Sequence, residues 1–154
     1  MPTRAIQFLK NKGISFEIVK YRHGEKGAAY AAQAAGYPLE RVVKTLVVNL
    51  DNHQFCLALM PGNKQLSLKH IAKAFSVKKA TLADASAAQR LTGYLVGGIS
   101  PFGSKQGLPA AIDDSLLQHG SVIINGGQRG LMLKIQVNEI VKVLGCRVCR
   151  LAQE

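Results

Sequence analysis

The chain has 154 residues, of which 47% are hydrophobic, so it can bury one continuous core, whereas two domains would each have a thin one. Its 20 lysines and arginines against 9 aspartates and glutamates give a formal charge of +11, which favours a polyanionic partner. No apolar run approaches the ~20 residues that cross a bilayer and no signal peptide is evident, so we expect one soluble, cytoplasmic domain over residues 1–154 with no membrane association.

The first 60 residues alternate between helical and strand patterns. In chain order we predict a helix over Ala5–Lys12 capped by Thr3, a strand over Ile14–Ile18, a reversal at Gly24 and Gly27, an alanine-rich helix over Ala28–Ala35 ended by Gly36, a short helix from Pro38 to Val42, and strands over Thr45–Leu50 and Phe55–Met60. The last two strands are joined by a short polar turn and are predicted to form a hairpin. Lys44 therefore lies at the start of a central strand.

The second part of the chain continues in the same manner. In order we predict helices over Leu68–Phe75, capped by Ser67, and over Ala83–Leu91, a helical turn around Leu116, a strand over Ser121–Asn125, a tight turn over Gly126–Gly130, a strand over Leu131–Ile135, a helix over Val137–Leu144 ended by Gly145, and a short terminal strand. Strands outnumber long helices and the hairpins are antiparallel. The sequence therefore predicts an α+β domain with a curved, mixed, largely antiparallel sheet surrounded by helices.

The cysteines and histidines do not form a metal-binding pattern. Cys56, Cys146 and Cys149 cannot all pair, and on a strand the side chains of Cys146 and Cys149 face opposite sides. The four histidines lack zinc-ligand spacing, and no dinucleotide-binding or Walker pattern occurs. We expect neither a metal nor a cofactor.

The segment Gly93–Gly103 is the most informative stretch, because glycines and a proline interrupt an apolar run. Adjacent amides near Gly97 and Gly98 could donate to an ester carbonyl as it becomes an oxyanion; the alternative is a bulged strand with a turn. Ser100 is not in a nucleophile elbow, so we expect it to bond the loop backbone or a ligand hydroxyl rather than to attack substrate.

Three segments carry a family resemblance, namely Val43–Val47, Gln89–Gly103 and Gly126–Leu131, in an order and spacing that extend over nearly the whole chain. With them the chain resembles the YbaK/EbsC-type aminoacyl-tRNA deacylases of the YbaK/prolyl-tRNA-synthetase-associated family. Members of that family hydrolyse mischarged aminoacyl-tRNA in trans, typically Cys-tRNA(Pro). The resemblance implies the acceptor end of tRNA as substrate and prolyl-tRNA synthetase as a candidate partner.

The resemblance also implies roles for individual residues. Lys44 corresponds to the functional lysine, and the backbone of Gly97 and Gly98 faces the ester. The residues expected to line the substrate pocket are Tyr21, Thr45, Tyr94, Ser100, Asn125, Gly126 and Gly127. In the family the thiol of a cysteinyl substrate is thought to attack its own carbonyl, so the enzyme is a hydrolase or a lyase that acts mainly by positioning.

Two positions depart from the family pattern. Met132 stands where an aspartate is usual, and the helix containing Ala28–Ala32 lacks the usual acidic residue. A deacylase for alanine or serine therefore stays open. A non-catalytic tRNA-binding module is the other alternative, although five Phe and four Tyr are few for base stacking.

Overall fold

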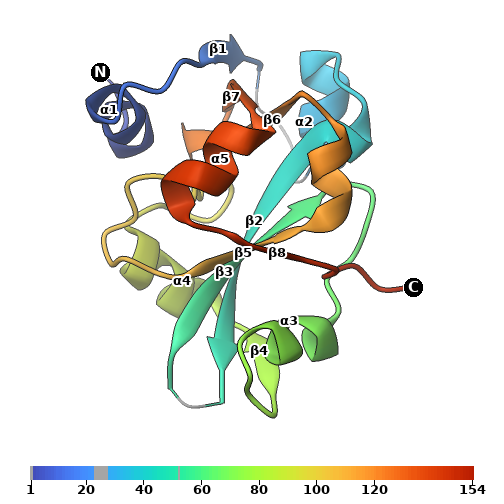
Figure 1. The fold of residues 1–154 in the computed structure, drawn as a ribbon. Coiled ribbons are helices and arrows are strands. Elements are labelled where there is room, and N and C mark those ends of the chain that lie inside the picture. The colour runs from blue at the N-terminus through green and yellow to red at the C-terminus, as the bar shows by residue number, and fades with distance from the viewer. Residues whose placement is uncertain (1, 23–27, 52) are drawn as a thin grey trace.

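The computed structural model describes residues 2–22, 28–51 and 53–154 (Figure 1). Within these ranges the strands join one twisted sheet in the order β1-β7-β6-β2-β3-β5-β8, with β4 also pairing with β2. The strands are β1 (Glu17–Lys20), β2 (Val42–Leu50), β3 (Phe55–Pro61), β4 (Ala80–Leu82), β5 (Ala110–Asp113), β6 (Ser121–Gln128), β7 (Leu131–Gln136) and β8 (Arg147–Cys149). The helices are α1 (Arg4–Asn11), α2 (Ala28–Ala35), α3 (Leu68–Ala74), α4 (Ala85–Thr92) and α5 (Val137–Leu144), with 3₁₀ turns η1 (Leu39–Arg41) and η2 (Asp114–Gln118).

The sheet is mixed. Antiparallel ladders join β1 to β7, β7 to β6, β2 to β3 and β2 to β4, whereas β2–β6, β3–β5 and β5–β8 are parallel. The predicted α+β class with a largely antiparallel sheet is confirmed.

Helices cover both faces of the central strand β2. Successive side chains of β2 point to opposite faces, so each face packs against its own set of helices. Val43 packs in a cluster with residues of α1 and α5, and Val47 packs with α4. On the opposite face Val42 packs against α2 and Val48 against α3. The helices therefore form two layers, with α1, α4 and α5 on one side of β2 and α2 and α3 on the other (Figure 1).

The helix caps predicted at Thr3 and Ser67 are confirmed. Thr3 Oγ1 accepts from the Ile6 N–H at 3.2 Å, and Ser67 Oγ accepts from the His70 N–H at 3.2 Å. Asp84 caps α4 by accepting from the Ala87 N–H at 2.8 Å, so this helix begins two residues later than predicted. Capping works here because a short side-chain oxygen satisfies an N–H that has no partner within the helix.

Several boundaries differ from the prediction. The first strand begins at Glu17, because Ile14 and Phe16 pack against the core before the chain pairs with β7. The short helix after Pro38 is the 3₁₀ turn η1, and β2 already begins at Val42. The short strands β4 and β5 were not predicted. The reversal predicted at Gly24 and Gly27 lies outside the described residues.

The predicted turn over Gly126–Gly130 is shorter than expected. The strand β6 continues to Gln128 through a β-bulge between Asn125 and Gln128, and the turn itself occupies Arg129 and Gly130. Asn125 Oδ1 accepts from the N–H groups of Gly127 and Gln128, which stabilises the bulge. This bulge lies directly beside the functional site described below.

The three cysteines are free, and burial raises the pKa of Cys56 and Cys146 to about 12. The described residues contain no cluster of three or more potential metal ligands. In the part of the chain that the structure covers, none of the helices is long and apolar enough to span a membrane.

Candidate functional site

One edge of β2 is divided between two partners. The parallel strand β6 pairs with Val42 and Val43, and the antiparallel strand β4 pairs with Val48, Asn49 and Leu50. Directly after β4, the N–H of Ala83 donates to the Val47 carbonyl at 2.9 Å, so residues 44–46 are the part of this edge that pairs with neither neighbour, although β3 pairs with them continuously on the opposite edge. At about 3.3 Å per residue, this leaves a gap of roughly 10 Å in the sheet.

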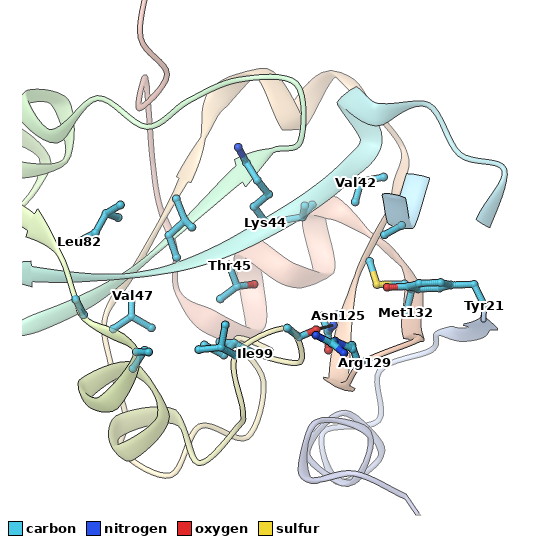
Figure 2. A pocket seen from close by; sticks show the side chains of 18 residues that line it. Tyr21, Val42, Lys44, Thr45, Val47, Leu82, Ile99, Asn125, Arg129 and Met132 are labelled. Carbon is cyan, nitrogen blue, oxygen red and sulfur yellow. Dashed lines mark hydrogen bonds between the residues drawn. The ribbon is translucent and has the colours of Figure 1, made fainter. Parts of the chain in front are cut away.

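A cavity of about 470 Å³ lies at this gap (Figure 2). Pairing between β6 and β2 stops at Ile124, immediately before the bulge, and a bulge bends its strand away from the partner. The lining residues come from β2, from the segment that leads from β4 into α4, from the loop after α4, from the β6–β7 hairpin, from α2 and from the residue directly after β1. They are Tyr21, Ala31, Val42, Val43, Lys44, Thr45, Leu46, Val47, Leu82, Ala83, Ala85, Ala88, Val96, Gly97, Ile99, Asn125, Arg129 and Met132.

Lys44 and Thr45 contribute to opposite sides of this cavity, because neighbouring residues of a strand point to opposite faces (Figure 2). Lys44 Nζ donates to the Lys64 carbonyl at 2.7 Å, and burial lowers the pKa of Lys44. Among the described residues, no carboxylate forms an ion pair with it. The hydroxyl of Thr45 is buried and has no hydrogen-bond partner in the described part of the chain. A buried hydroxyl without a partner is costly, which makes Thr45 Oγ1 a group that a ligand can satisfy.

The Gly97–Gly98 loop forms a tight turn over the Thr45 side of β2. The N–H of Gly98 donates to the Leu95 carbonyl at 2.9 Å, and Gly97 has a φ of 96°, which favours glycine. One amide of the predicted pair is therefore already engaged within the turn. The Gly97 N–H is the other, and it has no hydrogen-bond partner among the described residues.

The remaining glycines of the motif allow close packing beneath the cavity. A Cβ on Gly98 would lie 3.1 Å from the Gln128 Cα, and a Cβ on Gly127 would lie 2.8 Å from Tyr94 Cε1. A Cβ on Gly126 would meet Leu133 at 3.0 Å. Gly98 and Gly127 let the loop after α4 lie directly on the β6–β7 hairpin, whereas Gly126 makes room for a leucine side chain within the hairpin itself. None of the three lines the cavity.

Two further residues that the resemblance assigned to the pocket are part of the core. Tyr94 is only 5% exposed, and its hydroxyl donates to the Phe102 carbonyl at 2.5 Å. Ser100 is fully buried and its Oγ accepts from the Phe102 N–H at 3.3 Å, which is one of the two roles expected for it. Tyr21, by contrast, does line the cavity and packs edge-on against Tyr30. The structure thus brings Tyr21, Lys44, Thr45, Gly97 and Asn125 together around one space.

Arg129 and Met132 also line the cavity but were not among the predicted site residues. Arg129 belongs to the turn of the β6–β7 hairpin. The sequence feature that could have indicated a role for Arg129 is its place in the family-like segment Gly126–Leu131, shortly after a pair of glycines. Met132 is 3% exposed and packs with Ala32 and Val42. Of the described lining residues, Lys44 and Arg129 are cationic and none carries a carboxylate. The cavity is therefore apolar and positively charged.

Comparison with known proteins identifies the family. Residues 24–153 match the model of the aminoacyl-tRNA editing domain. The chain is 27% identical over 143 residues to EbsC of Enterococcus faecalis, a candidate Cys-tRNA(Pro)/Cys-tRNA(Cys) deacylase, covering 92% of this chain and 87% of the relative. An uncharacterised Bacillus subtilis protein, YwhH, is 23% identical over 124 residues, or 80% of this chain and 78% of the relative.

A solved structure extends this similarity to three dimensions. The crystal structure of a candidate trans-editing enzyme for prolyl-tRNA synthetase has a TM-score of 0.90 and 26% identity, covering 98% of this chain and 96% of the other. The resemblance inferred from the three sequence segments is confirmed, and the chain belongs to the aminoacyl-tRNA editing domain family.

Proposed function

We propose that residues 1–154 form one trans-editing domain that deacylates mischarged aminoacyl-tRNA, with Cys-tRNA(Pro) as the preferred substrate. The observation that carries the proposal is the positively charged cavity at the gap in β2, in a chain that belongs to the aminoacyl-tRNA editing family. The similarity to a candidate Cys-tRNA(Pro)/Cys-tRNA(Cys) deacylase supports the choice of substrate.

The cavity has the size and chemistry for the acylated end of tRNA. About 470 Å³ is within the usual range for small-ligand sites, and apolar walls with a few polar groups are typical of them. The formal charge of +11 attracts the phosphate backbone. Affinity for tRNA should therefore fall steeply with rising salt, and a flat salt response would indicate a small-molecule substrate instead.

The deeply buried end of the cavity selects the amino acid in this proposal. Ala31, Val42 and Met132 line that end and are each less than 5% exposed. Such a surface accepts a short, weakly polar side chain, which fits cysteine and also alanine. Because the described lining residues include no carboxylate, we propose that the hydroxyl of Thr45 accepts a hydrogen bond from the substrate ammonium.

We propose that the reaction is assisted by the substrate. The cysteinyl thiol loses its proton and its sulfur attacks the carbonyl carbon of the same residue. The ester C–O bond then breaks, the proton given up by the thiol is balanced by the one that the tRNA ribose oxygen takes up, and a thiolactone leaves. This is a lyase reaction, whereas attack by water would be hydrolysis. The Gly97 N–H stabilises the negative charge that develops on the carbonyl oxygen, and Lys44, on the other face of β2, adds a positive charge through the gap in the sheet once it leaves the Lys64 carbonyl.

A single-turnover panel of aminoacyl-tRNAs tests the proposal. Cys-tRNA(Pro) should be deacylated much faster than Ser-tRNA(Pro) or Ala-tRNA(Pro), because a thiolate is the better nucleophile. Equal rates for the cysteinyl and seryl esters would rule out the thiol-assisted route and leave hydrolysis. Binding of tRNA without any deacylation would instead indicate a non-catalytic module. Prolyl-tRNA synthetase is the partner we propose for delivery of substrate, testable by co-sedimentation with and without tRNA.

A further inference from the structure

Arg129 is the cationic side chain on the Gly97 side of the cavity. Its Nε lies 3.1 Å and its Cγ 3.6 Å from the position that a Cβ on Gly97 would occupy, so the side chain extends along the glycine turn. Figure 2 shows it beside Asn125, on the opposite side of β2 from the Lys44 ammonium. The Arg129 guanidinium and the Lys44 ammonium therefore lie on different sides of β2 and do not form one charged cluster.

Arg129 differs from the other partly buried arginine of the chain in having no acceptor. Arg41 donates to the carbonyl of Ser121 at 2.9 and 2.7 Å and to its hydroxyl at 3.0 Å. Arg129, also partly buried, forms no hydrogen bond or ion pair with any described residue. Its five N–H donors are held in a fixed fork that matches phosphate oxygens. A half-buried guanidinium without an acceptor, in a cavity without a described carboxylate, is suited to an anionic ligand.

We infer that Arg129 binds a backbone phosphate of the tRNA 3′ end and so positions the ester over Gly97. The inference rests on the proposed function. An aminoacyl ester has no free carboxylate, so the anion nearest to it is the phosphodiester on the 5′ side of the terminal ribose. Because Arg129 packs along Gly97, a phosphate held by its guanidinium places the attached ribose next to the turn that faces the ester. Arg129 is thus a positioning residue, separate from the role proposed for Lys44.

Binding to a chemically modified acceptor stem tests this inference without relying on turnover. The probe is a minihelix ending in CCA with serine attached through a non-hydrolysable 3′-amide, in versions where one of the last three phosphates is a neutral methylphosphonate. Arg129→Gln should weaken binding of the unmodified probe roughly ten-fold or more, as for loss of a charged hydrogen bond. Its affinity should also depend less on salt, with the slope of log K against log[salt] smaller by about 0.7 to 0.9.

The neutral linkages identify the phosphate. The wild type should lose affinity at the linkage that Arg129 contacts, and Arg129→Gln should be insensitive to the same replacement. Arg129→Lys, which keeps the charge without the fork, should recover part of the affinity. Arg90→Gln is the matched control, because Arg90 is exposed on α4, does not line the cavity and changes the net charge equally. Arg90→Gln should respond to every linkage as the wild type does.

The outcomes separate this inference from the proposed function. If Arg129→Gln binds as tightly as Arg90→Gln, or loses affinity equally at all linkages, the role of Arg129 is wrong even if the wild type deacylates Cys-tRNA(Pro). Absence of probe binding by the wild type at low salt would overturn both. Denaturation midpoints of the variants show whether a loss of binding comes from unfolding. If Arg129→Gln is unstable, the same comparison of linkages is made with Arg129→Lys.

Discussion

Asn125 joins the Gly97 turn to the bulge of β6. Its Nδ2 donates to the Gly97 carbonyl at 3.2 Å, while its Oδ1 accepts from the N–H groups of Gly127 at 2.7 Å and Gln128 at 3.1 Å. One amide side chain therefore fixes three backbone groups from two segments that are far apart in the sequence. The position of the turn over the cavity depends on this side chain.

Asn125→Asp should keep the hydrogen bonds within the bulge and remove the one to the Gly97 turn. The carboxylate can still accept from the bulge, but it replaces the donor to the Gly97 carbonyl with a repelling oxygen. We expect a folded protein whose single-turnover deacylation falls roughly ten-fold, because the turn loses its fixed position. Asn125→Ala should in addition lower the free energy of unfolding by about 1–3 kcal/mol, measured by urea denaturation. Full activity of Asn125→Asp would contradict the role of Asn125.

Gly97→Ala should abolish turnover, because a methyl group would stand where the ester approaches the turn, while tRNA affinity should fall no further than in Arg129→Gln, since the other basic residues still hold the phosphate backbone. The residue has a φ of 96°, and a Cβ would lie 3.1 Å from the Nε of Arg129. Gly13→Ala is the control, because Gly13 has a φ of 70° but no atoms within 4 Å of a Cβ. Both substitutions should cost about 1–2 kcal/mol of stability from the backbone conformation. Only Gly97→Ala should stop deacylation, and an equal loss of activity in both variants would show that strain alone is responsible.

Lys44→Ala should reduce deacylation between roughly ten-fold and a thousand-fold with little effect on folding, as for loss of one charge-stabilising donor. The pH dependence is a second readout. Burial lowers the pKa of Lys44 from 10.5, so the ammonium is lost at lower pH than in an exposed lysine. Enzyme turnover, corrected for spontaneous ester hydrolysis, should fall as the pH rises through this lowered pKa. Lys44→Arg should not show that fall, and a wild type that shows none would argue against a charged Lys44.

Asp113 makes a prediction about stability at acidic pH. Burial alone would raise the pKa of Asp113, but hydrogen bonds from the hydroxyl and N–H of Ser115 and from the N–H groups of Leu151 and Ala152 outweigh burial and lower it below 3.8. The resulting stabilisation is present above the unfolded pKa and is lost as the pH falls through the lower folded pKa. Asp113→Asn should be less stable at neutral pH and should approach the wild type below that pKa. Parallel denaturant curves from pH 2 to 7 would measure the difference.

The helices could be predicted from the sequence because their signals are local. Thr3 and Ser67 are the predicted caps, and their hydrogen bonds reach only three residues along the chain. The strands β4 and β5 could not be predicted in this way, because segments of three and four residues, Ala-Thr-Leu and Ala-Ala-Ile-Asp, are too short to show the alternating pattern of a strand. They become strands by pairing with β2 and β3, which is a property of the sheet.

The site was only partly predictable for a related reason. The segments containing Lys44, Thr45 and Gly97 could be singled out from their motifs, but the gap in the β2 edge depends on the register of three strands. Nor does the sequence show that the Gly98 N–H is used within the turn. The sequence predicts Arg129 only as a turn residue, and its side chain joins the cavity because the β6–β7 hairpin lies against the loop after α4.

Thr3, which caps α1, also donates from its hydroxyl to the Gly126 carbonyl at 2.5 Å. Its Cβ lies close to Gly127, and Ala5, Ile6 and Leu9 of the same helix belong to the core. The match to the editing-domain family, however, begins only at residue 24. A chain trimmed to the matched residues would lose the hydrogen bond from Thr3 to the Gly126 carbonyl. It would also expose to water the core side chains that α1 covers. The stretch by which the family is identified is thus smaller than the stretch needed to hold its pocket in shape.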